Sequence, residues 1–368
     1  MILSSIKIEN FKNYETAEIS FLPGVICFTG PNGAGKTNML DAIYYLCTGK
    51  SSINSIDQQL IRDDADYFSL KGEFETDKGA ETVLCVLIKG RKKVIKRNDE
   101  PYTRLIDHYG EFPVVMVAPG DIELIQGGSE ERRKWLDSVI SSVNHDYLLN
   151  LLKYDKILQQ RNAELRKMET GDSKPSLDLI KVYDSMIIPV AEDIFKTRTG
   201  FIADYMPYFE TFYHQISGKN EEISLTYLSE LQKNNLGLLL AGSIQKDLLL
   251  QRTNVGTHKD DLDFQIHGKP LKKFGSQGQQ KTFLLALKLA QLQFIKTIKG
   301  QTPILLLDDV CERLDEHRLS ILFRLIQEKE GSGQVFVTDT SAERVSGFME
   351  KDTEMKIFKV EKGKLEAN

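Results

Sequence analysis

The sequence contains no apolar run that approaches the ~20 residues needed to cross a membrane as a helix. Its first residues, 1–7, also lack a basic leader followed by an apolar core and a small-residue cleavage site. These absences argue against a membrane-spanning protein and against a secreted one. We therefore expect a cytoplasmic protein that has no membrane partner.

Cysteine and histidine are scarce and scattered. The four cysteines are widely spaced, so no C-x-x-C pair exists that could hold a metal or act as a redox centre. The six histidines form no close pair with metal-ligand spacing either. Both observations favour ordinary structural roles for these residues.

The chain also lacks an overall basic charge. Its net charge is −5, which gives no global signal for nucleic acid. Basic residues do gather locally, and the candidates for contact with DNA phosphates are Arg91, Lys92, Lys93, Lys96 and Arg97. A solvated β-hairpin is the usual explanation of so short a charge run, and both interpretations stay open here.

What the sequence does contain is a glycine-rich octet. Residues 30–37 read Gly-Pro-Asn-Gly-Ala-Gly-Lys-Thr and match G-x-x-x-x-G-K-[ST] at every fixed position. A short apolar stretch precedes the octet and a helical apolar periodicity follows it, whereas a chance glycine turn would lack this context. Backbone N–H groups of such a loop close around phosphate oxygens at the positive end of the helix dipole. The octet therefore predicts an ATP site formed by Gly30, Pro31, Asn32, Gly33, Ala34, Gly35, Lys36 and Thr37.

The last two residues of this loop have the most specific expected roles. Lys36 is expected to reach the β- and γ-phosphates, and the Thr37 hydroxyl is expected to bind Mg²⁺.

Two carboxylates follow a buried strand much later in the chain. The tetrad 304–307 is continuously apolar, as in a parallel strand covered on both faces, and Asp308 and Asp309 come directly after it. Open α/β sheets bind ligands at the carboxyl ends of their strands. We expect Asp308 to bind Mg²⁺ through water and Asp309 to orient or deprotonate the attacking water. An acidic turn after a core strand is the alternative, and the glycine loop weighs against it.

A third motif, Ser276-Gln277-Gly278-Gln279, begins a long helical periodicity. Ser276 is predicted to cap the N-terminus of that helix, which makes a second anion site. In the ABC ATPase superfamily S-x-G-Q is a signature that closes on a nucleotide held by another subunit. Ser276, Gly278 and Gln279 are therefore candidate nucleotide contacts, with an ordinary polar cap as the alternative.

The chain changes character along its length. The first ~115 residues read as β-rich, residues 130–216 read mostly as helix, and strand patterns return after about residue 256. We predict a discontinuous α/β ATPase lobe of residues 1–118 plus 250–368, with an inserted helical lobe of residues 119–249. The fold class is α/β, an ABC-type ATPase head (P-loop NTPase) with an inserted helical lobe.

The helical lobe is predicted to contain a short antiparallel helical hairpin. One helix has a seam with a period of seven, formed by Ile180, Ile187, Ile194 and Phe201. The opposing helix has an apolar series formed by Leu149, Leu152, Leu158 and Leu165, and residues 169–175 form the turn. Pro189 is expected to kink the second helix.

Together these features resemble the RecF family of bacterial DNA-repair ATPases, within the ABC/SMC superfamily. The resemblance covers nearly the whole chain and rests most on residues 8–14, 118–128, 132–137, 158–162 and 256–261. It assigns Lys12 and Asn38 to the nucleotide site. It also puts Thr338 near the position where transporters carry a switch histidine, which makes Thr338 a catalytic candidate.

The resemblance implies an ATP-dependent DNA-binding protein of recombinational repair. Such a protein dimerises on ATP, holds double-stranded DNA near junctions with single-stranded DNA, and works with RecR and RecO to help load RecA. Its hydrolysis is expected to be slow, because Asp309 is one methylene shorter than the glutamate common elsewhere in the superfamily.

Three departures and two alternatives belong beside this hypothesis. Thr257 and Lys259 stand where the family usually has Pro and Arg, and residues 312–315 (Glu-Arg-Leu-Asp) replace the usual Ser-x-Leu-Asp loop. A transporter ATPase subunit is the first alternative, but its two nucleotide motifs usually lie closer together. A chromosome-organising head is the second, but it needs long heptad arms that this chain lacks.

Overall fold

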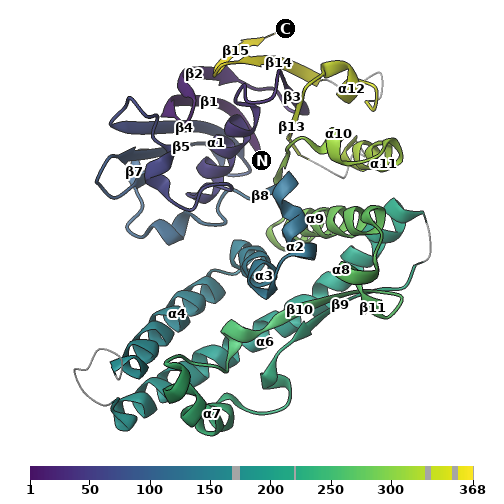
Figure 1. Cartoon of the computed structure of the whole chain (residues 1–368). Coiled ribbons are helices and arrows are strands. Elements are labelled where there is room, and N and C mark those ends of the chain that lie inside the picture. The colour runs from purple at the N-terminus through teal and green to yellow at the C-terminus, as the bar shows by residue number, and fades with distance from the viewer. Residues whose placement is uncertain (168–174, 219–220, 328–332, 350–354, 368) are drawn as a thin grey trace. The chain divides into compact units, whose positions relative to one another are not determined.

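The computed structural model of the chain describes residues 1–167, 175–218, 221–327, 333–349 and 355–367 (Figure 1). By their contacts the residues form two compact units. The first consists of Met1–Asp121, Thr211–Lys219 and Lys281–Asn368, and the second of Ile122–Glu210 and Asn220–Gln280. The predicted division into lobes remains a prediction, and it differs from these units chiefly at residues 250–280, which group with the second unit.

One sheet of the first unit is antiparallel, with the order β2-β1-β4-β5-β6-β7. Its strands are β1 (Ile2–Phe11), β2 (Tyr14–Ser20), β4 (Tyr67–Thr76), β5 (Gly79–Ile88), β6 (Val94–Arg97) and β7 (Glu100–Pro101). Buried and more exposed positions alternate along β4 and β5, because successive side chains point to opposite faces of a sheet. Only one face of this sheet is therefore apolar and packs on the core.

The second sheet is mainly parallel, with the order β15-β14-β3-β13-β12-β8. Its strands are β3 (Val25–Thr29), β8 (Val114–Val117), β12 (Ile304–Leu307), β13 (Val335–Asp339), β14 (Met355–Glu361) and β15 (Lys364–Ala367), the last antiparallel at the edge. Every residue of β3, β12 and β13 is buried, as the continuous apolar run at 304–307 predicts. The register places β13 between β3 and β12, so the ends of these three strands meet at one edge.

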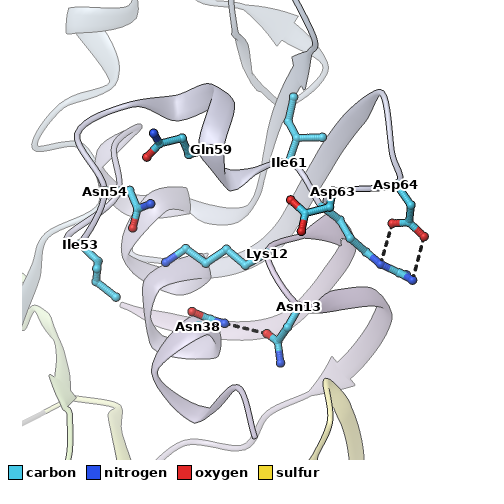
Figure 2. Close-up of a pocket in the computed structure, with 10 residues that line it drawn as sticks. Lys12, Asn13, Asn38, Ile53, Asn54, Gln59, Ile61, Asp63 and Asp64 are labelled. Atoms are coloured by element: carbon cyan, nitrogen blue, oxygen red, sulfur yellow. Dashed lines mark hydrogen bonds and ion pairs between the residues drawn. The ribbon is translucent and has the colours of Figure 1, made fainter. Parts of the chain in front are cut away.

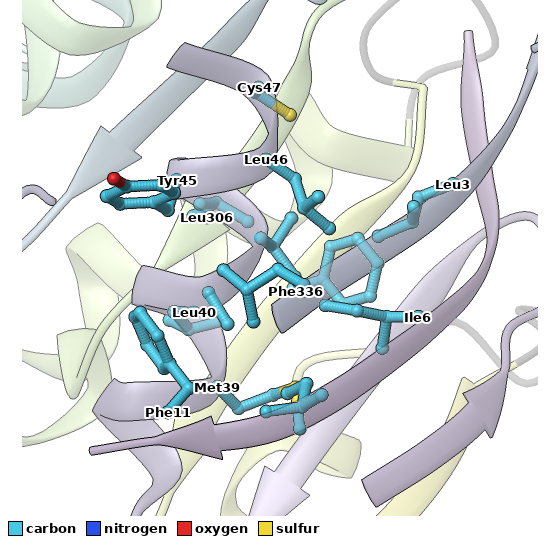
Figure 3. Close-up of a cluster of buried hydrophobic side chains, with 14 of the residues drawn as sticks. Leu3, Ile6, Phe11, Met39, Leu40, Tyr45, Leu46, Cys47, Leu306 and Phe336 are labelled. Atoms are coloured by element: carbon cyan, nitrogen blue, oxygen red, sulfur yellow. The ribbon is translucent and has the colours of Figure 1, made fainter. Parts of the chain in front are cut away.

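Helix α1 (Lys36–Thr48) contacts strands of both sheets. Its buried side chains join those of the two sheets in one hydrophobic cluster, which includes Leu3, Leu40, Leu46, Leu306 and Phe336 (Figure 3). Because this packing fixes α1, it also fixes the loop that connects β3 to the helix. The remaining short elements of this unit are η1 (Asp57–Leu60), η2 (Leu105–His108), α10 (Val310–Arg313), α11 (Glu316–Gln327) and α12 (Ala342–Ser346).

The second unit combines helices with a three-stranded antiparallel sheet of order β11-β10-β9. Its strands are β9 (Ile223–Leu228), β10 (Asp261–Ile266) and β11 (Lys269–Pro270). Its helices are α2 (Glu123–Gln126), α3 (Ser129–Val143), α4 (His145–Leu165), α7 (Leu236–Leu250), α8 (Leu271–Phe274) and the short η4 (Glu230–Gln232) and η5 (Thr257–Lys259). The helices α6 (Leu177–Ser217) and α9 (Gln277–Lys299) belong to both units, and η3 (Pro119–Ile122) lies at the boundary.

Helices α4 and α6 run antiparallel, as the sequence predicts for this hairpin. Arg161 Nε of α4 donates to Asp184 of α6 at 2.6 Å, and Arg198 Nε of α6 donates to Tyr147 of α4 at 2.9 Å. Since the earlier residue of α4 pairs with the later residue of α6, the helix directions are opposed. Apart from Pro175, the predicted turn at 169–175 lies outside the described residues, and Pro189 lies within α6.

The predicted apolar face of this hairpin is correct on α6 and only partly correct on α4. The seam of Ile180, Ile187, Ile194 and Phe201 is buried. On α4 the predicted Leu165 is buried, whereas Leu149 and Leu158 are partly exposed and Leu152 is 52% exposed. The other buried residues of α4 are Tyr147, Tyr154, Ile157, Arg161 and Glu164. The leucine periodicity fails at Leu152 because α4 buries tyrosine and arginine side chains whose polar ends have hydrogen-bond partners in the second unit.

Candidate nucleotide site

The glycine-rich loop of the first unit lies between β3 and α1, and its two outer glycines are required by its backbone. Gly30 and Gly35 have φ angles of 150° and 116°, which favour glycine. A Cβ at Gly30 would lie 2.2 Å from the carbonyl oxygen of Val360, and one at Gly35 would lie 2.4 Å from Asn13 Nδ2. Neighbouring chain segments therefore press closely on both ends of the loop. Of the residues between them, Pro31, Asn32 and Gly33 are exposed and Ala34 is buried.

Residues that follow β1 brace the loop from the side of its carbonyl groups. Asn13 Nδ2 donates to Ala34 O at 3.0 Å, and the Tyr14 hydroxyl donates to Gly35 O at 3.0 Å. Asn38, at the start of α1, donates to Asn13 Oδ1 at 2.7 Å. Sequence reasoning did not select Asn13 and Tyr14 as site residues, although both lie in the segment 8–14 that carries the family resemblance.

Lys36 lies against the loop that it terminates. Its Nζ donates to Gly30 O at 2.8 Å and to Pro31 O at 3.2 Å, and the residue is only 4% exposed. The ammonium group thus satisfies two loop carbonyls.

The two distant motifs of the sequence meet at Thr37. Its hydroxyl lies 2.9 Å from Asp308 Oδ1 and 3.1 Å from Asp308 Oδ2, so it donates to that carboxylate. Asp308 comes directly after β12, and its backbone N–H donates to Val117 O of β8 at 2.8 Å. The sheet therefore positions the carboxylate at the first turn of α1.

Thr338 of β13 connects the two carboxylate residues. Its hydroxyl donates to Asp308 Oδ1 at 2.8 Å and accepts the backbone N–H of Asp309 at 2.9 Å. The same hydroxyl lies farther from Asp309 Oδ1, at 3.4 Å, so its single proton goes to the nearer Asp308 and Thr338 acts on the arrangement of both carboxylates. This geometry fits a positioning residue, and the catalytic role predicted for Thr338 remains a prediction.

The electrostatic setting differs between the two carboxylates. Burial raises the pKa of Asp308, while hydrogen bonds from Thr338 and Thr37 act in the opposite direction. Asp309 is partly exposed and has a φ angle of 47°, in the left-handed region. Residues held in such conformations cluster at functional sites.

Lys12 lies beside the loop in an ion pair. Its Nζ is 2.7 Å from Asp41 Oδ2, and Asp41 also accepts hydrogen bonds from Ser51 and Ser52. Lys12, Asn13 and Asn38 line an open cavity of about 620 Å³. Figure 2 shows Lys12 extending across this cavity, with Asn13 and Asn38 hydrogen-bonded to each other.

The S-x-G-Q motif belongs to the second unit up to Gln280, and it forms a reciprocal cap. The backbone N–H of Gln279 donates to Ser276 Oγ at 3.2 Å, and Gln279 Oε1 accepts the N–H of Ser276 at 2.8 Å. The predicted helix cap is therefore confirmed. Ser276 is exposed, Gly278 is partly exposed, and Gln279 also donates to Glu221 at 3.0 Å.

Ion pairs divide the basic residues of β6 and the β5–β6 connection into paired and unpaired ones. Lys93 pairs with Asp57 at 2.7 Å, and Arg97 pairs with Glu81 and with Glu111. Within the described residues, Arg91, Lys92 and Lys96 have no ion-pair partner.

The oxygen atoms of Thr37 and Asp308 fit a bound Mg²⁺, since hard cations prefer oxygen ligands. Mg²⁺ usually takes one or two carboxylates together with substrate phosphates, so a cage of protein ligands is not needed. The described residues accordingly hold no group of three His, Cys, Asp or Glu residues arranged for a metal. None of the helices within those residues has the length and apolarity that crossing a bilayer demands.

Comparison with known proteins agrees with this geometry. A family model described as an AAA domain matches residues 5–359. The DNA replication and repair protein RecF of Phocaeicola vulgatus is 44% identical over 368 residues, which cover 99% of this chain and 98% of that protein. The protein of the same description from Flavobacterium johnsoniae is 41% identical and covers 95% and 97% of the two chains.

Two solved structures are similar in fold to this chain. One, described as the recombination mediator protein RecF-ATP in the RecFOR pathway, has a TM-score of 0.89 at 30% identity and covers 100% of this chain and 97% of that one. An Smc head bound to the C-winged helix domain of ScpA has a TM-score of 0.59 at 16% identity, with coverage of 100% and 97%, and so shares the fold. The predicted ABC-type ATPase head is confirmed. The chain belongs to the RecF family of DNA replication and repair proteins.

Proposed function

We propose that this chain binds ATP with Mg²⁺ at the glycine-rich loop. The observation that carries the proposal is the contact between the Thr37 hydroxyl and Asp308, which joins two motifs far apart in sequence. With ATP bound, Lys36 leaves the carbonyls of Gly30 and Pro31 and faces the β- and γ-phosphates. Mg²⁺, when bound, supplies charge neutralisation between those phosphates.

Hydrolysis is assigned to the residues around Thr338. Asp309 orients the attacking water and accepts its proton. Through one hydroxyl, Thr338 fixes the position of the Asp309 backbone relative to the Asp308 carboxylate. The short side chain of Asp309 makes the reaction slow, so hydrolysis serves as a timer for release from DNA.

The nucleoside end of ATP is placed against Lys12. The cavity that Lys12 lines adjoins the loop through Asn13 and Asn38. Because the Lys12 ammonium is paired with a fully buried carboxylate of α1, it is held in one position before the ligand arrives.

ATP binding drives formation of a homodimer in this proposal. Ser276 Oγ accepts the N–H of Gln279 within its own helix cap, and its proton stays available to a phosphate. That proton and the N–H of Gly278 would meet the γ-phosphate held by Lys36 of a second copy. A composite site of this kind explains why one chain carries two anion sites.

The DNA partner is double-stranded DNA, including junctions with single-stranded DNA. Relatives are described as DNA replication and repair proteins, and a solved relative is described as a recombination mediator of the RecFOR pathway. We therefore include RecR and RecO as protein partners, and assistance in loading RecA as the outcome. The residues proposed to contact phosphates are Arg91, Lys92 and Lys96, since Lys93 and Arg97 are engaged in ion pairs.

One experiment tests the proposal as a whole. Binding of a duplex with a single-stranded gap is measured over about 50 to 200 mM salt, with and without ATP. We expect ATP to tighten binding and Lys36→Ala to remove that effect. Duplex binding of equal strength with and without ATP would contradict the proposed ATP-dependent switch. It would favour an ABC-type ATPase subunit of another machine.

The structure supplies a matched pair for the phosphate contacts. Lys92→Glu is expected to weaken DNA binding without loss of stability, because Lys92 is exposed and unpaired within the described residues. Lys93→Glu places a carboxylate beside Asp57 and is expected to lower the melting temperature. Equal losses of DNA affinity at equal stability in both variants would refute this division of the cluster.

A further inference from the structure

A group of cations in the second unit is presented by a rigid polar framework. The framework begins with residues 256–261, Gly-Thr-His-Lys-Asp-Asp. His258 lies between the Tyr154 hydroxyl, 2.7 Å from Nδ1, and Thr253 O, 3.2 Å from Nε2. Asp260 receives Arg198 at 2.8 Å and the Tyr227 hydroxyl.

Asp261 completes this pattern by pairing with Arg132 at 2.7 Å. Thr257 is buried and gives its carbonyl to Arg198 at 2.8 Å. Lys259 is exposed, in contrast to these neighbours. The segment is therefore held by its other polar residues in a way that leaves Lys259 facing solvent.

The end of α7 is fixed to the same framework. Asp247 is fully buried and accepts Arg161 Nη1 at 2.8 Å and the N–H of Asn254 at 3.0 Å. Arg161 also donates to Thr253, whose carbonyl contacts His258. The exposed Lys246 and Arg252 flank this locked region.

Arg133 of α3 joins the group from a third segment. Its Nη1 donates to the carbonyl of Asp260 at 2.6 Å, directly after Lys259 in the chain. The four cations Arg133, Lys246, Arg252 and Lys259 form what we call the α7 basic patch.

This patch is not neutralised by its own surroundings. The nearby carboxylates of Asp247, Asp260 and Asp261 are committed to Arg161, Arg198 and Arg132. Lys246, Arg252 and Lys259 have no ion-pair partner in the part of the chain that the structure describes. Partial burial of the Lys259 side chain, and then repulsion from Arg252 and Arg133, lowers the pKa of Lys259. Like charges held together in this way stabilise the bound state of an anionic partner at the expense of the free protein.

We propose that the α7 basic patch binds the phosphodiester backbone of duplex DNA, as a contact surface separate from the β5–β6 cluster. The inference rests on the proposed function in DNA repair. A backbone with regular charges satisfies several exposed cations while leaving them hydrated. An acidic protein segment is the competing occupant, because Leu249 and Leu250 of α7 are also exposed, but these two leucines offer little apolar area beside four cations.

Neutralising the patch tests the proposal in full-length protein. The variant carries Lys259→Gln and Arg252→Gln. We expect duplex affinity to fall roughly ten- to a hundredfold near 0.1 M salt, and the slope of log affinity against log salt to drop by about 2. The melting temperature should stay equal or rise, because mutual repulsion has been removed.

The control is Lys181→Gln. Lys181 is an exposed lysine of the same unit, paired with Asp178 at 3.4 Å, and its loss is expected to leave DNA binding unchanged. An unchanged salt slope in the double variant, with normal binding by the wild type, would overturn the patch while leaving the proposed function intact, and would point to the protein occupant. A lower melting temperature with an unchanged slope would reduce the patch to a structural role. A wild-type protein that binds no duplex would refute the proposed function as well.

Discussion

Replacing Thr338 by valine asks whether one hydroxyl holds both carboxylate residues of the nucleotide site. Thr338 is fully buried, and valine has nearly the same shape, so the change removes little besides the hydroxyl. The variant loses the donor to Asp308 at 2.8 Å and the acceptor for the Asp309 N–H at 2.9 Å. One of these bonds involves a carboxylate, and the other leaves a partly buried N–H unpaired.

The size of the effect follows from those two bonds. A hydrogen bond to a charged group contributes about 1.5–3 kcal/mol, and an unpaired buried polar group costs about 1–3 kcal/mol. Loss of a partner that orients a metal-binding group typically weakens metal affinity by about 10- to 100-fold. We therefore expect the Mg²⁺-dependent part of ATP affinity to fall by roughly that factor.

The variant should also have a distinctive pH dependence. Burial raises the pKa of Asp308 in the folded protein, and losing the Thr338 donor raises that pKa further. Between the unfolded and folded pKa the folded state binds more protons, so this group adds stability to the nucleotide-free protein as the pH falls. Over the same range the protonated carboxyl no longer binds the cation. Acidification therefore weakens Mg²⁺-dependent ATP binding more in the variant than in the wild type.

Titration calorimetry with a non-hydrolysable ATP analogue measures this directly, in Mg²⁺ and in chelator, at two pH values. Thr338→Ser keeps the hydroxyl and should retain most of the affinity. Thr340→Val alters an exposed threonine two residues later and should have no effect. A Mg²⁺-dependent ATP affinity of Thr338→Val within about twofold of the wild type would refute this prediction. The loss expected for a missing metal-orienting partner is far larger.

Three further predictions address the other parts of the molecule. Asp309→Asn should bind ATP normally, hydrolyse it very slowly and accumulate as a DNA-bound dimer; wild-type turnover would move the catalytic role elsewhere. Ser276→Arg should bind ATP but stay monomeric by light scattering, and mixing it with Lys36→Ala should restore one composite site; an ATP-dependent dimer of Ser276→Arg alone rules out action in trans. Burial lowers the pKa of His108 and of His258 to about 4, so stability present above about pH 6.5 should fall by up to about 3 kcal/mol for each as the pH approaches 4. Urea titrations at both pH values check this, and an equal midpoint would show that these histidines are not buried in their neutral form.

Local patterns predicted the nucleotide loop well, because the chemistry of that loop is itself local. The apolar run before Gly30 forms β3, and the periodicity after Lys36 forms α1. The buried strand before Asp308 is equally plain, since a parallel strand covered on both faces reads as a continuous apolar tetrad. The contact between Thr37 and Asp308 depends on the sheet register, whereas the sequence motifs predicted only that both residues would bind Mg²⁺.

Buried polar networks were the part that sequence periodicity could not predict. Arg161 reads as an ordinary surface residue of an amphipathic helix, yet it is fully buried between Asp184 and Asp247. Each partner lies on a different helix, far away in the chain. Counting only leucine and isoleucine as core residues therefore placed Leu152 inside and missed Arg161, although Leu165 was predicted correctly.

The positions of free positive charges could not be predicted from the sequence either. The basic run around Lys92 looks like the strongest cationic site, but Lys93 and Arg97 are paired with carboxylates from other segments. The α7 basic patch could not be recognised in the sequence, because its members come from α3, α7 and the segment around Lys259. A cation is available to a ligand when the nearest carboxylates are paired elsewhere, and in the second unit Asp247, Asp260 and Asp261 pair with other arginines. The folding of that unit thus creates the uncompensated charge, since Asp247 and Asp260 pair with the buried Arg161 and Arg198, and Asp261 pairs with Arg132.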